Sequence, residues 1–157
     1  MITANLNELE LNRFEAENDP GQQCEATFPI FGALGTRNSA MVYFELDEGK
    51  NLGRHTDSEE EILLILEGDV ETTVGDETGR VSAGHIALVP KMVPHDLRNC
   101  GRGRARVLGF FGSPNIVATF DNTWLPTHSN VVDTSQLIQP VEIPANQANL
   151  QSVNEKE

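Results

Sequence analysis

Turn-forming residues recur along this chain at intervals too short for long helices, and they limit its fold more than any other feature. Clusters of Gly, Asp, Asn and Glu stand at 47–51, 67–69, 75–79 and 100–103. The segments between them are rich in Val, Ile, Phe and Tyr or alternate apolar with polar residues, as half-buried strands do. Many short strands without a long helical pattern predict an all-β sandwich or barrel.

The length of 157 residues suits one domain. The expected strands run over residues 24–31, 39–47, 60–66, 70–74, 80–82, 86–89, 95–99, 104–111 and 116–120. They place the barrel domain at 23–122, after an N-terminal arm at 1–22 that holds one short helix. The more polar residues 123–157 are expected to form a C-terminal extension, with one added strand at 137–143 and a mobile tail.

Composition excludes several classes of partner. Eleven Lys and Arg against twenty-four Asp and Glu give a net charge of −13, which repels nucleic acid and anionic membranes. No apolar run reaches the ~20 residues that span a bilayer. The acidic N-terminus lacks the pattern of a signal peptide, so a cytoplasmic location is expected. Cys24 and Cys100 are expected to be free thiols, with a disulfide as the alternative.

Four residues in the middle of the chain are candidate metal ligands. His55 and Asp57 are two apart, so an extended backbone points both to one face, and Glu61 begins the next strand. His95 begins a later strand whose apolar and polar residues alternate cleanly, which predicts that His95 faces inward. Imidazole nitrogens and carboxylate oxygens are the usual ligands of first-row divalent metals. The alternative is that the histidines and the SEEE run are solvated surface residues.

Eight residues around these ligands have a characteristic spacing: Gly49, His55, Glu61, Gly68, Gly84, Pro90, His95 and Asn99. This spacing resembles the two motifs of the cupin superfamily. The first family motif reads Gly, five residues, His, one residue, His, three or four residues, Glu, six residues, Gly. The second reads Gly, five residues, Pro, one residue, Gly, two residues, His, three residues, Asn. The resemblance implies a double-stranded β-helix, or jelly-roll, barrel that binds one divalent metal per chain.

Two positions depart from the motifs. Met92 replaces a glycine, which is expected to alter only the turn before His95, and Asp57 replaces the second histidine. If Asp57 binds the metal, the harder site favours Fe(II) or Mn(II) over copper(I), with Ni(II) or Zn(II) as alternatives. If it turns away, His55, Glu61 and His95 remain as a 2-His-1-carboxylate set. A decayed site that binds no metal is the third alternative.

The same alternation predicts the walls of a substrate pocket. The candidates are Phe44, Leu63, Ile65, Leu97, Phe110, Phe111 and Phe120, with a plain barrel core as the alternative. No Lys or Arg is expected to point inward from the ligand strands. A neutral apolar or aromatic small molecule therefore suits the pocket better than an anion such as oxalate.

The predicted function is a metal-dependent cupin-type enzyme with dioxygenase-like oxidation. Glu61 would be a ligand, and Asp57, if free, the general base. The alternatives are isomerase, cyclase or lyase chemistry, a non-enzymatic ligand-binding barrel, or a purely structural barrel. Ile62, Leu64 and Leu66 would leave an apolar outer face on their strand, which predicts a homodimer. The resemblance agrees, because single-domain cupins often pair.

Overall fold

The structure of the protein, a computed structural model, describes residues 1–137. Its strands are β1 (Asn12–Ala16), β2 (Gln23–Ile30), β3 (Ala40–Leu46), β4 (His55–Asp57), β5 (Glu61–Glu67), β6 (Asp69–Val74), β7 (Glu77–Ser82), β8 (Ile86–Val89), β9 (His95–Asn99), β10 (Ala105–Phe111), β11 (Val117–Leu125) and β12 (Ser129–Asp133), and its short 3-10 helices are η1 (Gly32–Leu34) and η2 (Thr134–Gln136). All the expected strands through 116–120 are present. Neither helix of this described range is long and apolar enough to cross a membrane.

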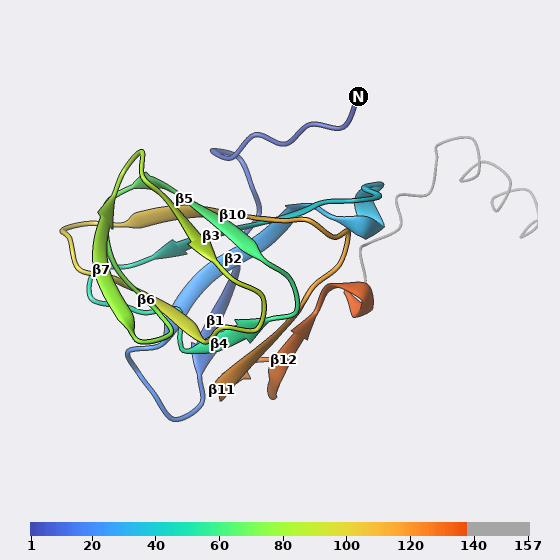
Figure 1. Cartoon of the computed structure of the whole chain (residues 1–157). Helices are drawn as coiled ribbons and strands as arrows, with labels where there is room; N and C mark the ends of the chain where they lie inside the picture. Colours follow the sequence, from blue (N-terminus) through green and yellow to red (C-terminus); the bar gives the residue numbers. More distant parts are fainter. Residues whose placement is uncertain (138–157) are drawn as a thin grey trace, which may run out of the picture.

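The strands form one antiparallel sheet that curls into a nearly closed jelly-roll barrel (Figure 1). Their order is β7-β6-β9-β4-β11-β1-β2-β3-β10-β5-β8, and β12 pairs with β11 outside this path. Strands distant in sequence therefore lie side by side, with β10 between β3 and β5. This order brings the two motifs together, because β4 pairs with β9 and β5 pairs with β8.

The shortest strand, β4, decides where the two motifs meet. It lies between β9 and β11, with His55 opposite both His95 and Phe120, and with Asp57 opposite Ala118. The turn before β9 is tied to the same strand, because the Met92 N–H donates to the Asp57 carbonyl at 3.0 Å. Met92 has a φ of 62°, which explains why the motif has glycine there: glycine adopts left-handed backbone without Cβ strain.

The two ends of the described chain differ from expectation. Residues 12–16, assigned to an arm with one short helix, form β1, which pairs with β2 and β11. The helix prediction was wrong because this segment has a period of two: Phe14 packs edge-on against Trp124 in the interior, while Arg13 and Glu15 are exposed. At the other end, an unexpected strand, β12, pairs with the extended β11. Of the expected strand at 137–143, all but Leu137 lies outside the described residues.

Alternation along the strands separates the core from the outer face. On β5, Glu61, Leu63 and Ile65 are buried as predicted, whereas Ile62 is 44% exposed. On β9, His95, Leu97 and Asn99 are buried, which confirms the inward assignment of His95. The local pattern decided the inward direction on β9, whereas β5 is apolar on both faces and its direction is decided by the tertiary structure.

Candidate metal centre

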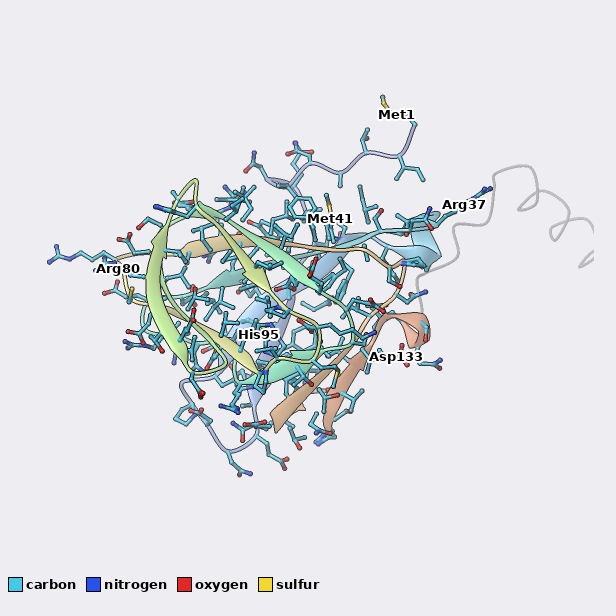
Figure 2. All side chains as sticks on the ribbon, viewed as in Figure 1. Met1, Arg37, Met41, Arg80, His95 and Asp133 are labelled. Atoms are coloured by element: carbon cyan, nitrogen blue, oxygen red, sulfur yellow. The ribbon has the colours of Figure 1, made fainter. Side chains whose placement is uncertain are left out.

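Three of the predicted ligands converge in the barrel interior. The side chains of His55, Asp57 and His95 are 5%, 3% and 1% exposed, and they offer ligand atoms that all lie within 4.8 Å of one another. Asp57 Oδ2 lies 3.1 Å from His95 Nε2 and 3.8 Å from His55 Nε2. Figure 2 shows His95 among the strands of the barrel rather than at its surface. These three residues form a group that can hold a metal ion.

Backbone carbonyls fix the tautomer of both histidines. His55 Nδ1 donates to the Gly53 carbonyl at 2.7 Å, and His95 Nδ1 donates to the Val93 carbonyl at 3.0 Å. Each Nε2 therefore carries a free lone pair, as a metal ligand must. Asp57 Oδ2 and His95 Nε2 are both buried without a hydrogen-bond partner. Two unpartnered buried acceptors that face each other are costly, and a cation between them removes the cost. The donor set thus fits a divalent metal.

The surroundings of His55 keep its ring neutral and oriented. Burial, followed by the proximity of His95, lowers the pKa of His55 to about 4. Its imidazole is therefore uncharged, and able to bind a metal, at neutral pH. Phe120 stacks on the same ring with centroids 4.4 Å apart and planes 19° apart, and Trp124 packs edge-on against Phe120. This aromatic stack restricts rotation of the ligand ring.

The fourth predicted ligand, Glu61, lies beside the cluster. Its Oε1 is 4.0 Å from His95 Nε2, and its side chain is buried. Burial, and then the negative charge of Asp57, raise the pKa of Glu61 well above its ordinary value. Gly109 on β10 makes room for this carboxyl, because a Cβ there would stand 2.9 Å from Glu61 Oε2. Asp57, whose role the sequence left open, therefore lies closer to the histidine nitrogens than Glu61 does.

A cavity of about 240 Å³ borders the cluster. His55, Asp57 and Glu61 line it together with six aromatic side chains: Phe14, Phe28, Phe44, Phe111, Phe120 and Trp124. Among the described residues, no Lys or Arg lines it. Its polar wall residues outside the cluster are neutral, Asn12, Thr27 and Thr127. Such a cavity favours an uncharged ligand with a planar or apolar body.

Three of the seven residues predicted to form the pocket wall line the cavity. Phe44, Phe111 and Phe120 line the cavity, but Leu63, Ile65 and Leu97 belong to the core and do not line it. Phe110 is half-buried on the outer face, because neighbouring residues of a strand point to opposite sides. The alternation gave the face of these residues but not their depth along the barrel.

Several wall residues were not predicted, many of them in the segments expected to form an N-terminal arm or a C-terminal extension. Phe14 and Cys24 come from β1 and β2, Trp124 from the end of β11, and Val132 from β12. The alternation of Asn12, Phe14 and Ala16 with Arg13 and Glu15 was the signal available in the sequence. Burial raises the pKa of the Cys24 thiol to about 12, so this thiol stays protonated. Cys24 and Cys100 are both free.

Comparison with known proteins decides the family. The model of the cupin domain matches residues 42–111. An uncharacterized protein of Streptomyces coelicolor is 30% identical over 81 residues, which cover 52% of this chain and 76% of the relative. This chain is a member of the cupin superfamily. The matched segment holds the four ligand candidates, so the cupin motifs account for the centre described above.

Solved cupin structures share the barrel at low sequence identity. A predicted oxalate decarboxylase of Thermotoga maritima is 19% identical with a TM-score of 0.60, covering 71% of this cupin and 98% of that chain. The polyketide cyclase RemF of Streptomyces resistomycificus is 19% identical with a TM-score of 0.59, covering 74% and 83%. The Cnp3 cupin domain of Schizosaccharomyces pombe is 18% identical with a TM-score of 0.58, covering 71% and 74%. These likenesses establish the fold and leave the reaction to be argued from the site.

Proposed function

We propose that this cupin is a metal-dependent enzyme that oxidises a neutral aromatic or apolar small molecule in a dioxygenase-like reaction. The proposal rests on one observation, which is that residues of the ligand cluster line the aromatic cavity. Aromatic walls without a cationic side chain meet His55 and Asp57 at one cavity surface. An oxalate-like dianion would find two carboxyl groups there, Asp57 and Glu61, and no Lys or Arg among the described lining residues.

One set of residues would bind the metal, and another would bind the substrate. His55, Asp57 and His95 would bind one divalent ion, which supplies Lewis acidity and, as Fe(II) or Mn(II), a redox-active centre. The aromatic walls exclude water and align a planar substrate beside the ligands. Glu61 lines the same cavity with a carboxyl whose raised pKa suits proton exchange with a bound group.

That last property favours a second candidate function. A buried carboxyl beside a Lewis-acid ion can exchange a proton with a bound substrate, which suits isomerase, cyclase or lyase chemistry that moves protons without consuming oxygen. Both candidates use the same cavity and the same ligands. They differ in whether molecular oxygen is consumed during turnover.

The test combines metal loading with a substrate screen. The metal-free protein is loaded separately with Fe(II), Mn(II), Ni(II) and Zn(II), and bound metal is measured by elemental analysis. Oxygen uptake and product formation are then followed with neutral phenols and aromatic ketones, and with oxalate as the anionic comparison. We expect one ion per chain and oxygen uptake only with neutral substrates. Products without oxygen uptake would instead support the second candidate, and binding without turnover would contradict both.

We also propose that two copies of this chain pair through β8. Ile86 and Leu88 on this strand are 71% and 56% exposed, and the neighbouring Ile62 of β5 is 44% exposed. β8 ends the path of paired strands within the described residues, so its second edge has unpaired backbone groups. A two-fold axis allows β8 to pair antiparallel with its own copy. The uncharged patch also lets two acidic chains approach without carboxylates in contact.

Leu88→Glu should therefore convert a dimer into a monomer. The new carboxylates would stand close together across the two-fold axis and repel each other. Light scattering should report twice the 17.2 kDa chain mass for the wild type and the single mass for the variant. Val131→Glu, at a 43% exposed position on β12, is the matched control and should stay dimeric. A monomeric wild type at micromolar concentration would refute the proposal.

A further inference from the structure

Asp96 follows His95 on β9 and points to the opposite face, where the sequence predicts solvent. In the structure this side chain is half-buried. One carboxylate oxygen accepts from the Gly53 N–H at 2.8 Å, and the other accepts from Asn51 Nδ2 at 3.2 Å. Both donors belong to the loop that leads into β4. The Asp96 carboxylate therefore joins the strand of one metal ligand to the loop that precedes the other two.

Gly53 connects this carboxylate to the metal centre. Its N–H is bound by Asp96, and its carbonyl accepts the hydrogen bond from His55 Nδ1 at 2.7 Å. The residue has a φ of +99°, and a Cβ there would stand 2.3 Å from the side chain of Gln22. Gly53 is thus confined by Gln22 and by Asp96, with no room for a side chain. The direction of the Gly53 carbonyl, and with it the tautomer of His55, depends on these contacts.

We infer that Asp96 is a positioning residue that acts through Gly53 to keep His55 Nε2 directed at the metal position. The inference rests on the metal site proposed above. Without the carboxylate, the Gly53 N–H has lost its acceptor and residues 51–54 can change conformation. Metal binding must then order this loop as well, which reduces affinity. Groups that orient a ligand histidine typically change metal affinity by about 10–100-fold, and we expect about tenfold here.

Asp96→Ala and Asp96→Asn separate hydrogen bonding from charge. Asparagine retains an oxygen that can accept from Gly53, whereas alanine retains none. Zn(II) affinity, measured by competition with a chromogenic chelator, should fall about tenfold in Asp96→Ala and stay within about threefold in Asp96→Asn. Nitrogen-15 NMR of the imidazoles in metal-free protein should show the Nδ1–H tautomer of His55 in wild type and Asp96→Asn. It should show mixed tautomers in Asp96→Ala.

Asp69→Ala is the matched control, because the Asp69 carboxylate accepts a hydrogen bond from Ser82 far from the ligands. It should leave both affinity and tautomer unchanged. If Asp96→Ala does not fold, Asp96→Leu keeps the branched side-chain shape without an acceptor and takes its place. Unchanged affinity and tautomer in either variant, or an equal loss in Asp96→Asn, would overturn the inference. A wild type that binds no Zn(II) would refute the proposed metal site, while the tautomer comparison would still test the role of Asp96.

Discussion

Replacing His95 with alanine should abolish metal binding and leave the barrel folded. His95 Nε2 is one of three clustered ligand atoms and lies 3.1 Å from Asp57 Oδ2. Loss of a direct ligand should weaken affinity by more than about 100-fold, beyond the usual effect of changing a group that merely orients a ligand. The truncated ring leaves a small cavity, which should destabilise the metal-free protein by about 1–3 kcal/mol. Elemental analysis and thermal unfolding measure the two effects.

His85→Ala is the control for that variant, because His85 is exposed and lies in the turn before β8. It should retain one ion per chain. Equal metal content in wild type and His95→Ala would show that the assigned centre is wrong.

Because the pKa of His55 is lowered to about 4, protons should compete with metal for this ligand only in the acidic range.

Asp57→Asn and Glu61→Gln should differ strongly in their effect on metal affinity, although both remove a buried carboxyl group. Asp57 Oδ2 lies in the ligand cluster, so its replacement should weaken metal affinity by more than about 100-fold. Glu61 lies beside the cluster, so Glu61→Gln should change affinity by less than about tenfold. Chelator competition measures both values. An equal and large loss in the two variants would show that Glu61 is also a direct ligand.

The metal-free proteins should also differ in their dependence on pH. The folded state raises the pKa of Glu61, so between about pH 4.3 and that raised value it holds a proton that the unfolded chain has released. At this group the folded state then binds more protons than the unfolded state, so the contribution of Glu61 to stability falls as pH rises through this window. His55, whose pKa is lowered to about 4, contributes the opposite trend between about pH 4 and pH 6.5. Glu61→Gln removes this loss and should melt at a higher temperature than wild type at pH 7.

Melting temperatures of metal-free wild type, Glu61→Gln and Asp57→Asn between pH 4 and pH 8 test this sign. Asp57→Asn should retain a weaker form of the decline, because burial remains as the first cause of the raised pKa of Glu61. Glu60→Gln is the control, since Glu60 is the exposed neighbour of Glu61 on the chain. His55 contributes equally to wild type and Glu61→Gln, so the difference between their melting temperatures isolates Glu61. A difference that does not grow from pH 4 to pH 8 would contradict a raised pKa of Glu61.

The local sequence pattern predicted much of the fold. Turn residues at short intervals marked nearly all the strands of the domain, since Gly, Asp and Asn end strands through their own backbone preferences. The period of two on β9 correctly predicted that His95 and Leu97 face inward. The identities of the four candidate ligands followed from residue chemistry and motif spacing. These are short-range properties, and each is carried by a few consecutive residues.

The tertiary structure decided what those patterns could not. Alternation places Leu63 and Phe44 on the same interior, but only the pairing of distant strands sets which one borders the cavity. The cross-strand register of β4 with β9 likewise brings Asp57, rather than Glu61, within 4 Å of both histidines. All six aromatic wall residues come from strands outside the two motifs. A strand's own sequence fixes the face of each side chain, whereas depth and contact depend on long-range pairing, which no local pattern encodes.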